Sequence, residues 1–243
     1  MCAAVVAAFV LVQASCSRVP ALVTLTAGGD GPPTLVLLHG YGSSAEDWVP
    51  FASTIAWPQP GRLVFPQGPD LYAPLAGPSG GRAWWALDLQ ARIPLGATMP
   101  DLSRTRPAGL QRATEAVVAL LGRLAQRPGG PVILGGFSQG AMVASEVAYR
   151  TSTPLAGLIL LSGTPVDEAT WRPGYGTRRG LPTFVAHGRR DPVLPFAASE
   201  RMQREIAAAG GRVTWHPFDG RHEIPEDVVI ALNEFLAGVR GTF

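Results

Sequence analysis

A serine between two glycines is the residue of this chain best suited to do chemistry. Ser138 lies in the stretch Gly-Phe-Ser-Gln-Gly at 136–140, after the apolar residues 132–134 and before a helix-like run. Glycines two positions on either side permit a strand-to-helix turn too tight for larger side chains, and such a turn exposes the hydroxyl to a carbonyl carbon. The pattern alone is weak evidence in a chain with 29 glycines. The apolar run before it and the helical run after it favour a nucleophile over a structural turn.

A serine hydroxyl needs a neighbouring base, and four histidines are available. Where a serine occupies such a turn, an acid and then the histidine follow it in the chain, which removes His39. His187 precedes the best acid and ends an apolar run, so we expect it to shape the exit of a strand. His216 ends another expected strand, where a half-buried sheet residue is the alternative role. His222 lies in a loop before the last helix, from which an imidazole can reach the serine, and we predict it as the base.

Two aspartates compete for the role of the acid that orients the imidazole and stabilises its protonated form. Asp191 comes just after an expected strand at 183–186. Asp167 follows the preceding strand, and its alternative role is the N-cap of a helix that begins at Glu168. We predict Asp191 as the acid.

The negative charge that develops on a carbonyl oxygen during acyl transfer needs preorganised N–H donors. One is expected from Gln139, the residue after the nucleophile. The second should come from the loop after strand 34–38, where Gly40 and Gly42 let the backbone turn its amides inward. The N–H of Tyr41 is therefore the second candidate.

The composition excludes several other classes of enzyme. All 20 basic residues are arginine, so the lysine of a P-loop, pyridoxal-phosphate or Schiff-base enzyme is missing. The two cysteines, Cys2 and Cys16, leave the body of the chain without a thiol nucleophile or a cysteine zinc site. The histidines are too scattered for a metal motif, and a net charge of +2 without a basic stripe indicates no nucleic-acid partner. We expect no metal site.

The order of the expected elements predicts one α/β domain. The 243 residues, 47% hydrophobic and 16% charged, fit a globular protein with a large core. Short β-branched runs alternate with helical stretches, which is typical of a mostly parallel sheet with helices on both faces. The expected strands are 21–26, 34–38, 62–65, 132–135, 155–161, 183–186 and 212–215. The expected helices are 45–55, 106–127, 140–150, 196–209 and 225–239.

A Pro/Gly-rich excursion at about 66–100 interrupts this rhythm, and a segment of this length often carries function. It contains Trp84 and Trp85. We expect these two side chains and Phe137 to line an apolar substrate-binding pocket, with packing in the core as the alternative.

Residues 1–16 contain an apolar run whose length suits the core of a signal peptide and is too short to span a bilayer. Small residues before Cys16 resemble a lipoprotein cleavage site, but the basic segment that normally begins a signal peptide is missing. A first strand or a misplaced start codon is the alternative. We place the folded domain at 20–243, expect no stable membrane insertion, and favour export to the periplasm slightly over a cytoplasmic location.

Several blocks in a fixed order make the chain similar to the carboxylesterase/phospholipase family of α/β-hydrolases, which includes small bacterial carboxylesterases and acyl-protein thioesterases. The blocks lie at residues 37–42, 81–85, 136–140, 187–195 and 220–222. The resemblance implies the triad Ser138, Asp191 and His222. It also implies oxyanion donors at Tyr41 and Gln139, no cofactor, and a homodimer as a frequent state. The N-terminal segment and the Gly/Pro-rich surroundings of the paired tryptophans depart from the family pattern, which leaves substrate and compartment open.

We therefore expect a serine carboxylic-ester hydrolase that acts on short- to medium-chain or aryl esters through an acyl-enzyme. The alternatives within hydrolases are a lysophospholipase or acyl thioesterase, and a secreted polyester or feruloyl esterase. A cofactor-free peroxidase and a non-catalytic binding protein are alternatives of a different class on the same fold.

Overall fold

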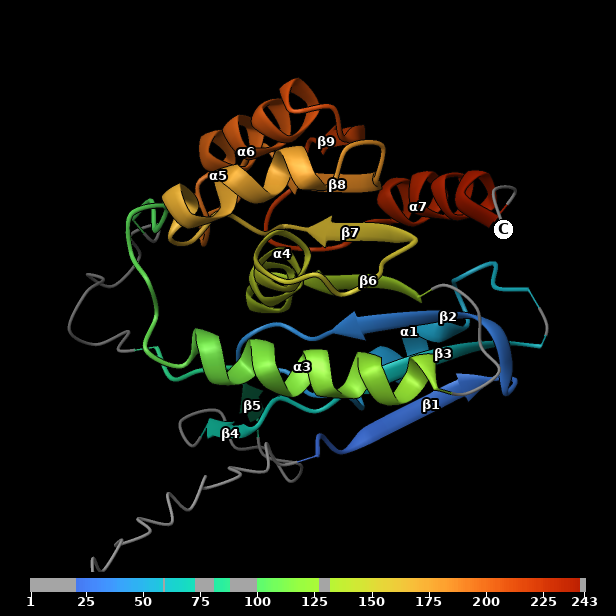
Figure 1. Ribbon diagram of the computed structural model, residues 1–243. Coiled ribbons are helices and arrows are strands. Elements are labelled where there is room, and N and C mark those ends of the chain that lie inside the picture. The colour runs from blue at the N-terminus through green and yellow to red at the C-terminus, as the bar shows by residue number, and fades with distance from the viewer. Residues whose placement is uncertain (1–20, 59, 73–80, 88–99, 127–131, 241–243) are drawn as a thin grey trace, which may run out of the picture.

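The computed structural model describes residues 21–58, 60–72, 81–87, 100–126 and 132–240, and the signal peptide predicted at 1–16 lies outside them. The described residues form a central seven-stranded sheet with helices around it (Figure 1). Its strands are β1 (Thr24–Gly28), β2 (Gly31–Leu38), β3 (Gly61–Pro66), β6 (Val132–Phe137), β7 (Gly157–Leu161), β8 (Pro182–Gly188) and β9 (Arg212–Phe218). The helices are α1 (Trp48–Ala52), α3 (Leu110–Ala125), α4 (Gln139–Arg150), α5 (Glu168–Thr177), α6 (Phe196–Ala208) and α7 (Glu226–Arg240).

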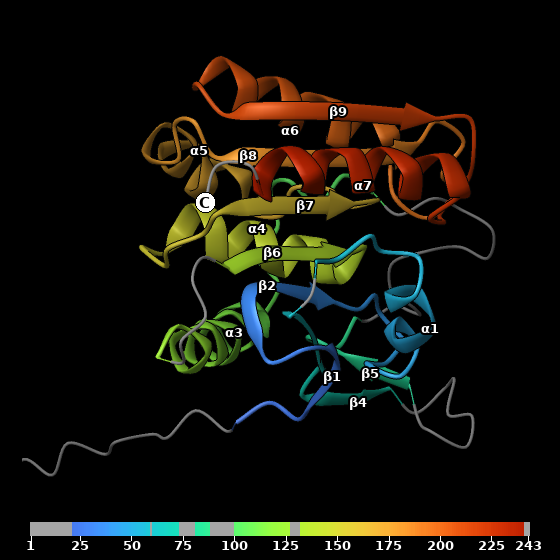
Figure 2. The same cartoon turned by 90° about the vertical axis from the view of Figure 1, so that its right-hand side faces the viewer.

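The strands run in the spatial order β1-β3-β2-β6-β7-β8-β9. Every neighbouring pair is parallel except β1 with β3, which is antiparallel. Because parallel strands end at the same edge of a sheet, the loops after β2, β6, β7, β8 and β9 gather there (Figure 2). The mostly parallel sheet predicted from the sequence is confirmed.

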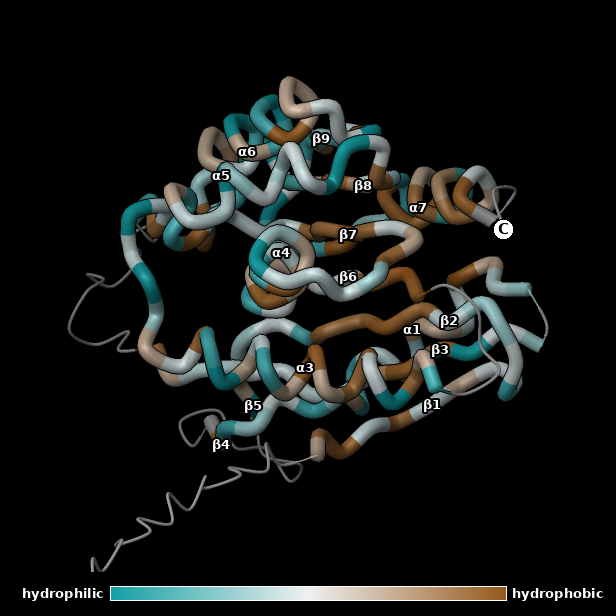
Figure 3. The backbone as a smooth tube through the Cα atoms, viewed as in Figure 1, coloured by the Kyte–Doolittle hydropathy of each residue, from teal (hydrophilic) through white to brown (hydrophobic). Residues whose placement is uncertain are grey.

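Helices cover both faces of the sheet, so its central strands are buried on both sides and read as continuous apolar runs. In β2, Val36 and Leu38 join the core under α3, α4, α5 and α6, whereas Leu35 and Leu37 join the core under α1 and α7. Figure 2 shows α7 in front of the sheet and α4 behind it. In Figure 3 much of β2 and β7 and the first part of β6, at the centre of the molecule, have the colour of hydrophobic residues. This rigid, doubly covered centre supports the strand ends that carry the candidate site.

Helix α4 follows the Gly-Phe-Ser-Gln-Gly stretch and is buried along almost its whole length, since α3 and α5 flank it and the sheet lies beneath it. Helix α3 covers α4 with one apolar stripe, because its buried residues recur every three or four positions from Leu110 to Leu124. The helix that begins at Gln139 is therefore held in place by packing on three sides.

Helix α5 and the strand pair of β4 (Asp70–Tyr72) and β5 (Gly81–Ala83) were not predicted. Helix α5 contains Pro173 and Gly174, which disfavour a helix by propensity. Packing overrides that preference: Trp171 and Tyr175 are buried, and a side chain at position 174 would overlap the backbone of Tyr149 on α4. The excursion contains β4 and β5 as a small antiparallel pair, while residues 73–80 and 88–99 lie outside the described part.

The helix predicted at 45–55 is shorter than expected, since α1 begins only at Trp48. Asp47 explains the late start. Its carboxylate accepts hydrogen bonds from the Ser43 hydroxyl and from the Ser44 N–H, which holds the preceding residues in a loop.

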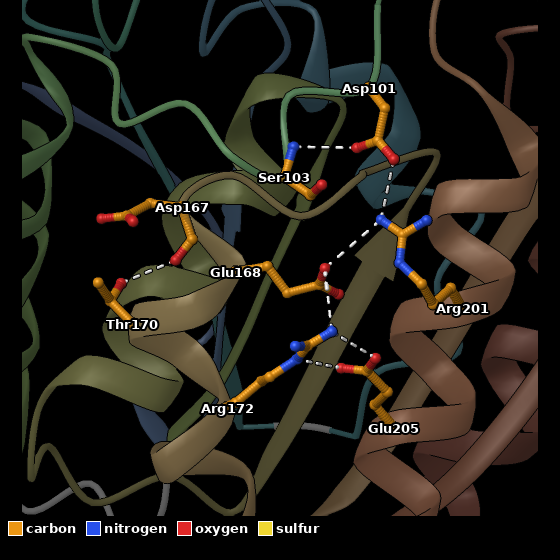
Figure 4. A network of polar contacts seen from close by, with 8 residues as sticks. All are labelled: Asp101, Ser103, Asp167, Glu168, Thr170, Arg172, Arg201 and Glu205. Atoms are coloured by element: carbon orange, nitrogen blue, oxygen red, sulfur yellow. Dashed lines mark hydrogen bonds and ion pairs between the residues drawn. The ribbon is translucent and has the colours of Figure 1, made fainter.

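A charged network joins α5, α6 and the segment before α3 (Figure 4). Arg201 on α6 contacts Asp101 at 3.0 Å and Glu168 at 3.4 Å. Arg172 on α5 contacts Glu205 at 2.8 Å and Glu168 at 3.7 Å. Exposed pairs contribute little individually, but the buried Glu168 is shared by both arginines and fixes α5 against α6.

Among the described residues, every helix is too short or too polar to cross a bilayer.

Candidate active site

The turn between β6 and α4 holds Ser138 in a conformation that few residues adopt. Its φ of 55° and ψ of −118° lie in a strained region of the backbone map. Space explains the flanking glycines: a side chain at Gly136 would overlap the backbone of Gly140, and one at Gly140 would overlap the carbonyl of Leu38 on β2. The Ser138 N–H donates to the carbonyl of Leu161 at 2.8 Å, which ties the turn to β7. The strand–turn–helix predicted around the serine is confirmed.

A chain of hydrogen bonds connects the serine to a histidine and an aspartate from two other strand ends. Ser138 Oγ lies 2.9 Å from His222 Nε2, and His222 Nδ1 lies 2.7 Å from Asp191 Oδ2. The hydroxyl donates to Nε2, and Nδ1–H donates to the carboxylate. The ring of Phe137 packs against the imidazole with centroids 4.8 Å apart. The three residues, up to 84 positions apart in sequence, thus form one continuous chain of hydrogen bonds, which we call the relay.

Asp191 is buried, yet four hydrogen-bond donors surround its carboxylate. Oδ1 accepts the N–H groups of Val193 at 2.7 Å and Leu194 at 2.9 Å. Oδ2 accepts from His222 and lies 3.1 Å from His187 Nε2. Burial opposes the charge, but the hydrogen bonds from the two histidines and the attraction of His222 outweigh it and hold the pKa of Asp191 well below its ordinary value. The carboxylate is ionised at neutral pH, as a partner for an imidazolium requires.

The loop after β2 lies directly beside the serine. A Cβ added at Gly40 would sit 3.1 Å from the Phe137 ring and 3.4 Å from Ser138 Cβ. Gln139 directly follows the serine and begins α4, at the positive end of the helix dipole. The loop that carries Tyr41 and the first residue of α4, Gln139, are the two segments predicted to supply the oxyanion donors, and both adjoin the nucleophile.

His39 sits under that loop and fixes one peptide plane in it. Its Nδ1 is 2.7 Å from the carbonyl oxygen of Gly40, and its Nε2 accepts the N–H of Gly68 at 2.9 Å. That pairing assigns the proton to Nδ1 and makes the ring neutral. Burial is the largest cause that lowers the pKa of His39 to about 4. Since the Gly40 carbonyl and the Tyr41 N–H belong to one planar peptide unit, His39 also sets the direction of the Tyr41 N–H.

The side chain of Gln139 clamps the paired tryptophans. Its Oε1 accepts the Trp84 N–H at 2.9 Å, and its amide donates to the Trp85 carbonyl at 2.9 Å. The indole of Trp84 donates to the His39 carbonyl at 2.9 Å. Sequence reasoning missed this link between the loop after β2 and α4, because contacts between residues 55 positions apart leave no local pattern.

The two indoles themselves are 0% and 2% exposed, within the core under α3 and α4. The prediction that Trp84 and Trp85 line an open substrate pocket is therefore corrected in favour of its alternative, core packing, because neither side chain presents surface to a substrate. Phe137 is half-buried against His222, so its predicted contact with substrate stays a prediction.

Two rejected candidates, Asp167 and His216, have other partners. Asp167 precedes α5 and pairs with Arg106 at 2.9 Å. His216 on β9 pairs with Asp227 of α7 at 3.2 Å. His187 does end its strand as predicted, but it also contacts Asp191, a contact that its place in the sequence did not reveal. In the part of the chain that the structure describes, no group of three or more metal-ligating side chains comes together.

Comparison with known proteins connects this geometry to a family. The phospholipase/carboxylesterase family profile matches residues 25–239. The chain is 27% identical to the acyl-protein thioesterase 1 of Yarrowia lipolytica over 219 residues, which cover 84% of this chain and 87% of that protein.

Solved structures agree on the fold. Esterase PE8 superposes with a TM-score of 0.77 at 28% identity, over 90% of this chain and 100% of that one. The Zea mays acyl-protein thioesterase 2 superposes with a TM-score of 0.69 at 20% identity, over 89% of this chain and 98% of that one. The predicted α/β-hydrolase fold is confirmed.

Proposed function

The chain belongs to the phospholipase/carboxylesterase family of hydrolases, and we propose that it is a serine hydrolase that cleaves carboxylic esters of short- to medium-chain or aryl type. One observation carries the proposal: the continuous hydrogen-bond relay from Ser138 Oγ through His222 to Asp191. A structural turn needs the glycines but has no use for a histidine and a buried carboxylate in line with its hydroxyl.

The mechanism follows from the positions of these atoms. Ser138 Oγ attacks the acyl carbonyl carbon while His222 Nε2 takes the hydroxyl proton. Asp191 stabilises the imidazolium, which then gives the proton to the leaving alcohol. Water, activated by the same imidazole, releases the acyl group from the serine in the second half of the reaction.

The oxyanion of each tetrahedral intermediate needs donors on the side of the serine away from the imidazole. The N–H groups of Gln139 and Tyr41 are the proposed donors, because Gln139 follows Ser138 at the start of α4 and Tyr41 lies in the loop that approaches Ser138 at Gly40. His39 and the Gln139 side chain hold these two segments in place before substrate arrives, so little reorganisation accompanies the charge.

Acyl thioester hydrolysis is the second candidate, favoured by the 27% identity to a protein named acyl-protein thioesterase 1. The same relay serves both reactions. A thiolate leaves with less help from a protonated His222 than an alkoxide does.

An acyl-chain series separates the candidates. We would measure kcat/KM for p-nitrophenyl esters from acetate to palmitate, for the matching S-acyl thioesters, and for a lysophospholipid. Each methylene that enters an apolar pocket contributes about 0.8 kcal/mol, so the chain length at which kcat/KM stops rising reports the depth of the pocket. A maximum at short to medium esters supports the proposal. A rise that continues to palmitate, with thioester preferred over ester, favours the second candidate.

A further inference from the structure

A second histidine shares the carboxylate oxygen that orients His222. His187, at the end of β8, is 0% exposed, and its Nε2 lies 3.1 Å from Asp191 Oδ2. The same Oδ2 lies 2.7 Å from His222 Nδ1. One oxygen therefore faces two imidazoles, one from β8 and one from the loop after β9.

The surroundings assign the proton of His187. Nε2 faces two acceptors, Asp191 Oδ2 and the Leu194 carbonyl at 3.3 Å, so Nε2 carries the hydrogen and donates. Nδ1 is buried and makes no hydrogen bond to any described residue. The edge of the Phe196 ring contacts the imidazole, with centroids 6.0 Å apart. An apolar side chain of similar size would avoid the unsatisfied nitrogen, so the donation to Asp191 is the contact that requires a histidine here.

His187 supplies a restraint that the other donors do not. Both N–H groups on Oδ1 come from the turn of Asp191 itself, at Val193 and Leu194, and they leave Oδ2 free to tilt. His187 Nε2–H holds Oδ2 from the sheet side. Gly188, the next residue, packs against the loop that carries His222, since a side chain there would overlap the carbonyl of Arg221. The strand end, the carboxylate and the His222 loop thus form one packed unit.

We propose that His187 is a positioning residue that fixes Asp191 Oδ2 on His222 Nδ1 and keeps the negative charge on the carboxylate while His222 carries the proton. The proposal rests on the proposed role of the relay in ester hydrolysis. His187 contacts neither the substrate nor the reacting atoms and acts only through Asp191.

Two substitutions distinguish the loss of the His187 N–H donor from the loss of side-chain volume. His187→Gln places an amide N–H near the position of Nε2, whereas His187→Leu removes the donor. With a p-nitrophenyl ester we expect His187→Leu to lower kcat by about 10- to 100-fold, the range for loss of one hydrogen bond to a charged group. KM should change by less than about twofold, since substrate does not contact this ring, and His187→Gln should recover most of the rate. If His187→Leu fails to fold, His187→Asn, whose shorter amide does not reach Oδ2, replaces it.

The matched control is His216→Leu, which removes a histidine from the neighbouring strand β9, where the ring contacts Asp227 instead. This variant should keep the wild-type kcat. Equal losses of kcat in the His187 and His216 variants would overturn the proposal, because they would show a general response of the sheet.

A double-mutant cycle tests that His187 works through Asp191. In an Asp191→Asn background, His187→Leu should change kcat by less than about twofold, since the charge it supports is gone. Independent losses that multiply in the double variant would overturn the proposal.

A readout that does not depend on turnover keeps this inference apart from the proposed function. The proton shared by His222 Nδ1 and Asp191 Oδ2, which are 2.7 Å apart, should give a resonance far downfield in the proton NMR spectrum. In a Ser138→Ala background the proposal predicts that His187→Leu shifts or broadens that resonance and His187→Gln does not. An unchanged resonance in His187→Leu would overturn the positioning role, whereas absence of ester hydrolysis by the wild type, with this shift present, would overturn only the proposed function.

Discussion

Replacing His39 by glutamine should remove a measurable part of the acid sensitivity of the fold. The ring is 1% exposed and neutral, with its Nε2 accepting the Gly68 N–H and its Nδ1–H donating to Gly40. Glutamine can still accept from Gly68, but it does not titrate. The comparison therefore isolates the ionisation of one buried imidazole.

The magnitude follows from the pKa of His39, which burial lowers from 6.5 to about 4. Between these two values the unfolded chain binds a proton that the folded protein does not, so the free energy of unfolding rises with pH. The contribution is fully present above about pH 6.5 and is lost as the pH falls towards 4. A difference of about 2.5 pH units corresponds to about 3 kcal/mol, of which about 2 to 3 kcal/mol is lost between pH 7 and pH 4.5.

Urea titrations followed by tryptophan fluorescence at about pH 7 and about pH 4.5 provide the assay. The wild type should lose about 2 to 3 kcal/mol more than His39→Gln over this interval, while carboxylates contribute equally to both proteins. His216→Gln, which removes a partly exposed histidine on β9, is the matched control for loss of an imidazole. Equal acid losses in wild type and His39→Gln would refute the argument that His39 is buried without charge.

Further predictions concern the base and the turn around the nucleophile. His222→Ala should lower kcat by roughly three orders of magnitude or more, because only binding and oxyanion stabilisation remain. His216→Ala should reduce Tm more than kcat. If the two results were interchanged, the base would be His216 on β9. In urea titrations, Gly140→Ala should lower the free energy of unfolding by several kcal/mol, because the added Cβ would overlap the Leu38 carbonyl. Gly122→Ala in α3, where an added Cβ meets no atom within 4 Å, should raise it by about 0.5 to 1 kcal/mol. A stable, active Gly140→Ala would contradict the close approach of β2 and α4.

The elements predicted from the sequence are those whose apolar pattern is local. All seven strands of the sheet were expected near their observed positions, because buried parallel strands appear as short β-branched runs. Helix α5 escaped prediction because Pro173 and Gly174 argue against a helix, and only its packing on α4 holds it. The two tryptophans were misassigned for a related reason: a Gly/Pro-rich segment looks exposed, yet its backbone is clamped by Gln139 and its indoles enter the core.

The candidate site likewise contains residues that the sequence could predict and contacts that it could not. Ser138, Asp191 and His222 could be proposed from motif order, and the structure brings their side chains into hydrogen-bond contact. The contacts of His39 and His187 could not be predicted, because each depends on a partner supplied by a different strand end or on the fold of a neighbouring loop. Residue type and spacing identify groups that react; the groups that hold them emerge only from packing.

The central claim is that Ser138 is the nucleophile, and labelling with a serine-directed aryl phosphonate tests it most directly. Peptide mass spectrometry of the inhibited protein should place one phosphonyl group on Ser138, with loss of ester hydrolysis in proportion to the label. Ser138→Ala should take up no label and keep the wild-type Tm, because the substitution keeps the Cβ and removes only the hydroxyl. Label on another residue, or a Ser138→Ala protein that retains more than a few per cent of kcat with contamination excluded, would contradict the account.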